Sequence, residues 1–213
     1  MPIARYFLIS CLAFALPAAA DEPAEDTGEH VHVLKGDKWV YEDFDDITGE
    51  KKYELTYVVT EDSGQEIVVN ATNGKGNDFM IFDNDWDMVK DNVWRQKPHD
   101  ATGVKLPLSV GKEWRTTHIV QHLKSGTARS ASSDTKVVAK ESVTTKAGTF
   151  DTFKVVTVEE RPAMQDPTSH DRFTVTTWYA PAVKRWVKRT FEQKTDGHLA
   201  NAYSLLLSSY SVK

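Results

Sequence analysis

Apolar and polar residues alternate with a period of two through most of this chain, and this pattern restricts it to a fold built from β-strands. In Lys52–Thr60, for example, every second residue is apolar, which places those side chains on one face of a strand. Turn-forming pairs such as Asn73-Gly74 and Ser125-Gly126 separate the alternating runs. No run of about 12 residues or more has the 3.6-residue period of an amphipathic helix. The sequence therefore predicts an all-β protein.

The alternating runs are long and closely spaced, which is typical of an antiparallel meander. Asp85–Gln96 is compatible with a bent strand or a helical turn, and we favour the strand. From the residues alone, the meander could close into a barrel, remain an open half-barrel or form a sandwich. The expected strands are residues 38–44, 52–60, 66–72, 78–83, 85–96, 113–124, 128–134, 135–145, 150–160, 172–180, 184–193 and 202–212.

A short repeated motif raises the question of two similar halves. Gly36-Asp37-Lys38-Trp39 and Gly111-Lys112-Glu113-Trp114 stand 75 residues apart, and each opens a long alternating run. A turn and a returning strand follow each run. Because a Gly-x-x-Trp match is short enough to arise by chance, a two-fold repeat and a single irregular meander both remain open.

The first 20 residues have the organisation of a secretory signal peptide. Met1–Arg5 carries one positive charge, Tyr6–Leu16 is apolar, and Ala18-Ala19-Ala20 provides the small residues that signal peptidase requires. The apolar run is too short to span a bilayer. Residues 21–32 are expected to form a flexible acidic leader, and residues 33–213 a single β domain. We therefore expect a periplasmic or secreted protein without a transmembrane segment.

Cys11 offers an alternative form of export. Leu8-Ile9-Ser10-Cys11 matches the pattern in which the cysteine is lipidated, which would give an outer-membrane lipoprotein. The apolar run continues beyond it to Leu16, which favours a cysteine that simply lies within the signal peptide. Cys11 is the one cysteine of the chain, so cleavage after Ala20 leaves no disulfide and no thiol chemistry.

The charge balance argues against nucleic acid as a partner. The formal net charge is −5, and removal of Arg5 with the signal peptide makes the chain one unit more acidic. A protein that neutralises phosphates needs a basic surplus. One basic run does stand out, at Lys184-Arg185 and Lys188-Arg189. It could contact anionic head groups, but pairing with the acidic surface is the interpretation that we favour.

Candidate metal motifs are incomplete, and catalytic motifs are missing. Asp83–Asp87 has the first ligand positions of a calcium loop, but the glycine and the twelfth-position glutamate of that loop are absent. His30 and His32 would share one strand face, as would His118 and His122, without a further ligand at a recognised spacing. The chain has no Gly-x-Ser-x-Gly elbow. We predict no metal, no cofactor and no catalytic residue.

The aromatic residues are the remaining candidates for a binding surface. Trp178 and Trp186 lie in adjacent expected strands, and Trp114 begins another. Core packing is the simpler explanation for them. On the concave face of a curved sheet, however, the three could line a site for an apolar small molecule or lipid. We therefore name Trp114, Trp178 and Trp186 as candidate ligand-binding residues.

The second half of the chain resembles a known family in three ordered motifs, Ala147–Val155, Trp178–Pro181 and Val187–Arg189. They are similar to motifs of the TapB-like family, which comprises uncharacterised secreted bacterial proteins with a domain of unknown function. The resemblance covers about Leu106–Lys213. It implies a curved antiparallel sheet that forms an open half-barrel, like that of periplasmic lipoprotein carriers, and it supplies no catalytic residues. The family has an acidic residue and then Val-Gly after the second motif, where this chain has Ala182-Val183-Lys184.

Together these features predict a non-enzymatic periplasmic β-protein that binds an apolar or lipid-like ligand or a cell-envelope partner. An envelope hydrolase or metal-dependent enzyme is one alternative, because the chain has seven histidines and the acidic run Asp83–Asp87. An adaptor that binds its partner through an exposed strand edge is another.

Overall fold

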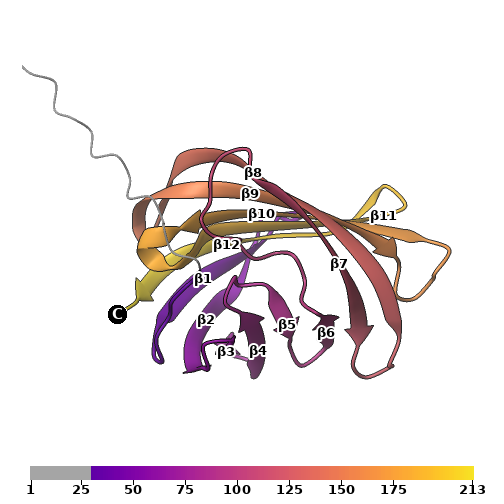
Figure 1. The fold of residues 1–213 in the computed structure, drawn as a ribbon, viewed down its shortest axis with the longest axis horizontal. Helices are drawn as coiled ribbons and strands as arrows, with labels where there is room; N and C mark the ends of the chain where they lie inside the picture. Colours follow the sequence, from indigo (N-terminus) through magenta and orange to yellow (C-terminus); the bar gives the residue numbers. More distant parts are fainter. Residues whose placement is uncertain (1–29) are drawn as a thin grey trace, which may run out of the picture.

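The alternating runs form the strands of one antiparallel sheet in a computed structural model of the protein, which describes residues 30–213 (Figure 1). The predicted signal peptide, Cys11 and residues 21–29 of the predicted leader lie outside the described residues. Within residues 30–213, no helix is long and apolar enough to cross a membrane. The elements are β1 (Lys38–Asp45), β2 (Lys51–Asp62), β3 (Glu66–Thr72), β4 (Asn77–Asp83), β5 (Met88–Lys90), β6 (Trp94–Lys97), β7 (Glu113–His122), β8 (Ala128–Thr145), β9 (Gly148–Pro162), β10 (His170–Ala180), the 3-10 helix η1 (Pro181–Val183), β11 (Arg185–Thr195) and β12 (His198–Ser211).

The strands follow one another in chain order around a closed barrel. The first strand, β1, pairs with both β2 and the last strand, β12. Trp39 lies opposite Tyr57 on one side and Tyr210 on the other. The predicted all-β antiparallel meander is confirmed, and the sheet closes further than the open half-barrel that the resemblance implied. Closure pairs the backbone groups that an open edge would leave free.

Two expected runs have different boundaries in the structure. Residues 128–134 and 135–145 form a single strand, β8, in which a bulge leaves Val138 unpaired. Residues 85–96 form two short strands with a turn between them. The Asp91 carboxylate makes this turn by accepting hydrogen bonds from the Val93 and Trp94 amides. The alternation of apolar residues contains no sign of such a local carboxylate–amide turn.

The two Gly-x-x-Trp motifs have the same backbone geometry. Gly36 and Gly111 both have a φ of +92°, which residues other than glycine rarely adopt. The Gly36 N–H donates to the Val59 carbonyl at 2.8 Å, and the Gly111 N–H donates to the Val137 carbonyl at 2.8 Å. Each motif therefore begins a long hairpin, β1–β2 or β7–β8, in the same way.

The connector between β4 and β5 also matches the connector between β10 and β11. Each contains a non-glycine residue in the left-handed region, Trp86 with a φ of 62° and Lys184 with a φ of 59°. The Trp86 N–H donates to the Asp83 carbonyl at 3.2 Å, and the Lys184 N–H donates to the Pro181 carbonyl at 3.0 Å. The halves β1–β6 and β7–β12 thus share matching hairpins and matching connectors.

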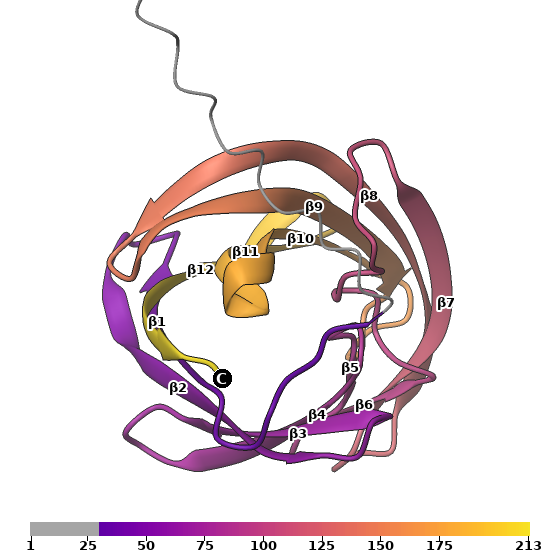
Figure 2. The same cartoon turned by 60° about the vertical axis from the view of Figure 1, so that its left-hand side comes forward.

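The β10–β11 connector fills one end of the barrel. Its short helix, η1, lies inside the ring of strands (Figure 2). Trp39 Nε1 donates to the Val183 carbonyl and Trp86 Nε1 donates to the Lys184 carbonyl, both at 2.8 Å. Both tryptophans are fully buried in the hydrophobic core. Two indole N–H groups therefore hold the connector in place and close this end.

Candidate functional site

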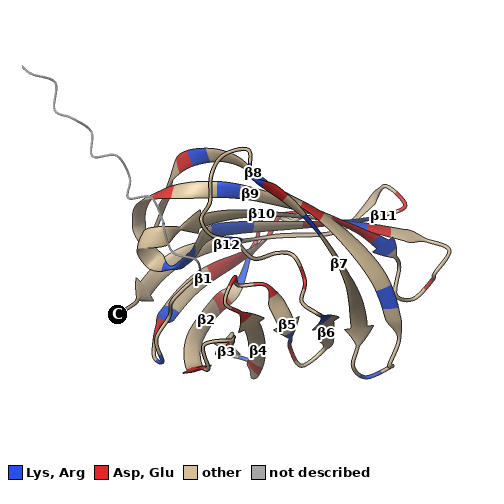
Figure 3. Cartoon of the chain, viewed as in Figure 1, with Lys and Arg blue, Asp and Glu red and all other residues tan. Residues whose placement is uncertain are grey.

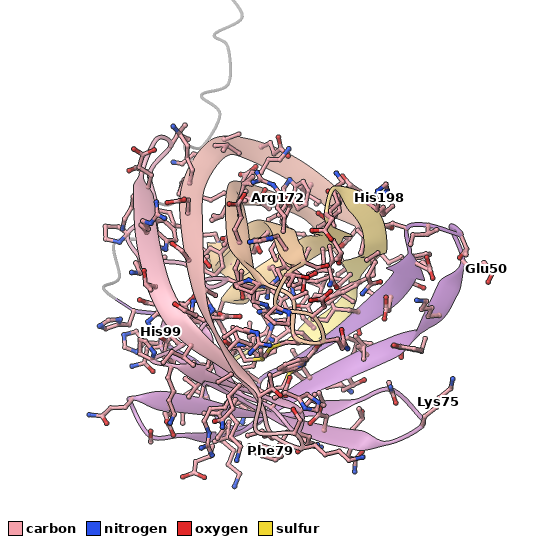
Figure 4. All side chains as sticks on the ribbon, turned by 90° about the vertical axis from the view of Figure 1, so that its right-hand side faces the viewer. Glu50, Lys75, Phe79, His99, Arg172 and His198 are labelled. Atoms are coloured by element: carbon pink, nitrogen blue, oxygen red, sulfur yellow. The ribbon has the colours of Figure 1, made fainter. Side chains whose placement is uncertain are left out.

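A cavity of about 490 Å³ lies inside the barrel. From the end opposite η1, side chains crowd the inside of the ring, and Arg172, His198, Glu50 and Lys75 lie around its rim (Figure 4). The cavity volume is in the range of small-molecule sites. The middle part of its wall is apolar and includes Val175, Phe191 and Leu205. Tyr57 and Phe82 line the η1 end, and Phe173, opposite Gln193, lines the other end.

The part of the cavity wall farthest from η1 is polar, and its groups bond to one another. Along β11 the wall residues run from Arg185, next to η1, to Gln193, about 25 Å away along an extended strand. Arg161 donates to Glu159 at 2.8 Å, and Gln193 donates to Asp171 at 3.2 Å. The charged groups at this end of the cavity therefore have partners within the protein.

Arg185, at the η1 end of the cavity wall, lacks such a partner. Its side chain is fully buried, and none of its three nitrogens has a hydrogen-bond partner among the described residues. Aromatic rings surround it instead, with centroids 4.0–5.3 Å from the guanidinium carbon. Cation–π attraction thus stands in for the carboxylate that usually accompanies a buried arginine. The rings belong to Trp39, Tyr57, Phe82, Trp86 and Trp186.

Burial shifts the pKa values of the groups around this arginine. Burial lowers the pKa of Arg185 to about 10, and the nearby Tyr41 and Tyr57 hydroxyls limit the fall. Burial also raises the pKa of both of these tyrosines, and it raises the pKa of Tyr203 to about 12. Arg185 therefore keeps its positive charge at neutral pH, beside tyrosines that stay neutral.

Trp186 brings a second unbonded donor to the same place. Its indole Nε1 is buried and has no acceptor among the described residues. The centre of its ring system lies 4.0 Å from the guanidinium carbon of Arg185 and 4.5 Å from that of Arg189. The β10–β11 pairing skips Val187, and a bulge of this kind changes the direction of neighbouring side chains. Trp186 and Arg189 both reach the cavity wall as a result.

The structure does not bring the three predicted tryptophans to one surface. Trp186 is part of the cavity wall. Trp178 lies opposite Lys154 and Lys188, whose ammonium groups cover its ring at 5.0 and 4.5 Å. Because side chains alternate along β10, Trp178 faces away from the cavity. Trp114 is half-buried and packs against the hydrophobic core. Ligand binding by these residues stays a prediction, and Trp186 is the best placed of the three.

The basic run 184–189 is divided between two environments. Lys184 Nζ lies 3.9 Å from an Asp37 carboxylate oxygen, whereas Arg185 and Arg189 belong to the cavity wall. The expected pairing with surface carboxylates is therefore wrong for Arg185, which is buried without one. Elsewhere, basic and acidic residues are interspersed over the strands (Figure 3). The alternation of side chains along a strand could have indicated that neighbouring basic residues face different ways.

A second polar cluster connects the loop after β6 to the β4–β5 connector. Within residues 30–213, Asp83, Asp87 and His99 form the one group of three acidic or histidine side chains close enough to share a metal ion. Neither of the predicted histidine pairs takes part in it. His99 Nδ1 lies 3.1 Å from Asp87, which also accepts the Gly103 N–H at 2.6 Å. Asp83 accepts the amides of Asp85 and Asp87. These contacts give the cluster a structural role in holding the loop.

The Asp87–His99 pair has shifted pKa values. Burial raises the pKa of the Asp87 carboxyl to about 6. The hydrogen bond to Asp87 raises the pKa of His99 to about 9, although partial burial acts in the opposite direction. At neutral pH the pair is therefore an ion pair.

The fold and the site together define a closed antiparallel β-barrel whose internal cavity carries an unpaired cation at its closed end. A family model described as DUF3108-like matches residues 108–195. This range contains the three motifs on which the resemblance rests, whereas the TapB-like assignment itself stays a prediction. A search of curated proteins finds no match.

Solved structures of exported bacterial proteins share the fold. A candidate lipoprotein from Parabacteroides distasonis is 16% identical, with a TM-score of 0.54 over 84% of this chain and 96% of that one. A candidate exported protein with a YmcC-like fold, from Bacteroides fragilis, is 17% identical, with a TM-score of 0.54 over 85% of this chain and 98% of that one. The hypothetical lipoprotein YmcC from Escherichia coli is 11% identical, with a TM-score of 0.51 over 83% and 85%. At these identities the likeness concerns the fold alone.

Proposed function

We propose that this protein is a non-enzymatic exported β-barrel that binds an apolar or lipid-like ligand in its internal cavity. The cavity of about 490 Å³ with its apolar middle carries the proposal. Side chains fill the interior of a small barrel, whereas larger barrels enclose space for a ligand. A twelve-stranded barrel that keeps this much space is therefore suited to hold a molecule.

The surroundings of the cavity support binding over catalysis. The carboxylates on its wall are engaged in protein contacts. Asp91 and Asp100 accept backbone amides, Glu159 accepts Arg161, and Asp171 accepts Gln193. A general acid or base needs a free proton-transfer position within reach of the substrate. These carboxylates instead stabilise the wall.

Export supports a ligand from the cell envelope. The signal peptide directs the chain to the periplasm, and the solved structures with this fold are described as exported proteins or lipoproteins. Lipidation at Cys11 remains the alternative route to the same compartment. The closed strand order favours a ligand over an adaptor role, because each strand from β1 to β12 already has a neighbour on both sides.

The test combines extraction with a binding titration. The mature protein is purified without detergent, extracted with organic solvent, and the extract is analysed by mass spectrometry for lipids. The delipidated protein is then titrated with dodecanoate while tryptophan fluorescence is recorded. Trp94 and Trp186 line the cavity, so we expect saturable quenching.

A matched pair of variants locates the binding. Val175 lies on the cavity wall, and Val138 is 41% exposed on the outside of the barrel. Val175→Phe fills part of the cavity, and we expect it to weaken dodecanoate binding at least tenfold, about 1.4 kcal/mol. Val138→Phe adds the same atoms outside and should change nothing. Lipid-free extracts together with an unquenched titration would refute the proposal.

A further inference from the structure

Two buried hydrogen-bond donors at the closed end of the cavity have no acceptor. They are the Arg185 guanidinium and the Trp186 indole N–H, both on the cavity wall. Buried polar groups in folded proteins are nearly always bonded, and a buried charge nearly always has a counter-charge. Gln96 Oε1 and Arg161 Nε on the same wall also lack partners, but Arg185 and Trp186 are adjacent in the chain and Arg185 carries a charge, so together they indicate a missing acceptor.

We propose that this end of the cavity binds the anionic head group of a single-chain amphiphile, with the ligand's head at Arg185 and its chain in the apolar middle of the barrel. The proposal rests on the proposed function and specifies its ligand class. Guanidinium and indole groups can only donate hydrogen bonds, so the matching group is one that only accepts. A carboxylate, phosphate or sulfate meets this condition, whereas an ammonium group does not.

The protein itself has no carboxylate left for Arg185. Asp100, another buried acid on the cavity wall, already accepts the Met88 and Thr102 amides. Glu159 and Asp171 bond to groups at the opposite end of the cavity. A water molecule could accept the hydrogen bonds but would leave the charge uncompensated. An anion satisfies both the donors and the charge.

Arg189 adds a second positive charge beside the same ring. Its guanidinium carbon lies 4.5 Å from the centre of Trp186, and its Nη2 donates to the Thr102 carbonyl at 3.0 Å. Burial raises the pKa of the Asp100 carboxyl and the nearby charge of Arg189 opposes this rise, so part of the Arg189 charge is balanced within the protein. Two arginines against one indole create a positive potential at the closed end. Because the Arg185 nitrogens are shielded, a head group reaches them only if a neighbouring ring moves, and the proposal assigns this movement to Trp186, whose indole makes no hydrogen bond.

The distribution of polarity along the cavity sets the orientation of the ligand. Beyond Trp186 and Arg189, β11 contributes Phe191 to the apolar wall and then Gln193 at the polar end. Phe173 and Val175 of β10 lie beside this path. An amphiphile with its head at Arg185 places its chain along these residues. The reverse orientation would leave Arg185 against a hydrocarbon chain.

The test compares ligands that share one chain and differ in the head group. Dodecanoate, dodecanol and dodecyltrimethylammonium are titrated against the delipidated full mature protein. We expect dodecanoate to bind about tenfold to a hundredfold more tightly than dodecanol, the value of a charge-assisted hydrogen bond, and the ammonium compound to bind most weakly. In Arg185→Met this preference should vanish while dodecanol still binds. Arg185→Lys, which keeps the charge, should retain part of it.

Each further outcome has a fixed meaning. Arg172→Met removes an exposed arginine and should leave the preference unchanged. Equal binding of dodecanoate and dodecanol by the wild type overturns the head-group site but leaves the lipid-like ligand standing. If the wild type binds none of the three compounds, both proposals are overturned. If inorganic phosphate alone raises the melting temperature as much as dodecanoate does, the site takes a free anion and the amphiphile is refuted.

Discussion

Replacement of Arg185 by methionine should stabilise the ligand-free protein. The fall of its pKa from 12.5 to about 10 on burial corresponds to about 3 kcal/mol of destabilisation of the charged form, at 1.36 kcal/mol per pKa unit. The surrounding rings return about 2 kcal/mol through desolvated cation–π contacts. A methionine in the same aromatic surroundings regains about 1 kcal/mol through sulfur–ring contacts. The expected net effect is a gain of about 2 kcal/mol.

Urea unfolding and thermal melting measure this effect directly. In a chain of this size, about 2 kcal/mol corresponds to a rise in melting temperature of about 4–8 °C. Arg172→Met is the matched control, because Arg172 is an exposed arginine on the rim (Figure 4). We expect its effect to stay within about 0.5 kcal/mol. Most buried-residue substitutions destabilise, so a gain at Arg185 alone would be diagnostic.

The opposite result would refute the reasoning. A loss of about 2 kcal/mol or more in Arg185→Met would mean that the guanidinium has a stabilising partner in the empty protein, and the argument for a missing acceptor would fail. Ligand provides a second check. Dodecanoate at 100 times its dissociation constant should stabilise the wild type by about 2.7 kcal/mol. The variant should gain much less. The difference in free energy of unfolding between the variant and the wild type should therefore shrink or change sign when ligand is present.

Two further predictions concern the cluster that holds the loop after β6. A Cβ at Gly103 would lie 2.1 Å from the Asp85 carbonyl oxygen, so Gly103→Ala should destabilise the protein by about 2 kcal/mol or more in urea unfolding. Gly76 has open space around it, so the control variant Gly76→Ala should have little effect. Equal effects of the two substitutions would show that the loop does not pack as described. His99 has a pKa of about 9 in the folded chain and an ordinary value of 6.5, so its ion pair with Asp87 stabilises the protein most near pH 6.5. This contribution is lost as the pH rises through about 9, and it also weakens below about pH 6, where Asp87 is protonated. Unfolding measured from pH 6.5 to 9.5 should show this loss, and His99→Gln should flatten the curve; an unchanged slope in the variant would assign the pH dependence to other groups.

The sequence carries enough information for the class of fold but not for its closure. Alternation in Lys52–Thr60 and in similar runs is a local property of each strand, and it predicts the sheet correctly. Whether β1 meets β12 depends on the accumulated twist and tilt of all the strands. No single run encodes that sum. The turn at Asp91 was missed for a related reason, because it depends on a side-chain hydrogen bond and not on the apolar pattern.

The candidate site was only partly predictable. Trp186 could be named because it is aromatic and lies in a strand, but the same criterion selected Trp178, which faces outwards. The difference comes from the bulge at Val187, which the letters around it do not reveal. Arg185 belongs to a basic run that suits an exposed strand, and only the fold shows that five aromatic rings enclose it.

A comparison of the matching connectors in the two halves supports a ligand-binding role for Arg185. Trp86 and Lys184 occupy equivalent left-handed positions, so the residues that follow them, Asp87 and Arg185, are equivalent as well. In the first half the buried charge of Asp87 is bonded to His99 and to a backbone N–H. In the second half the buried charge of Arg185 meets aromatic rings and the Tyr41 hydroxyl, and no carboxylate pairs with it among the described residues. The same connector geometry can therefore provide a partner for a buried charge, as it does for Asp87. The lack of a protein counter-charge at Arg185 is best explained by a ligand that supplies one.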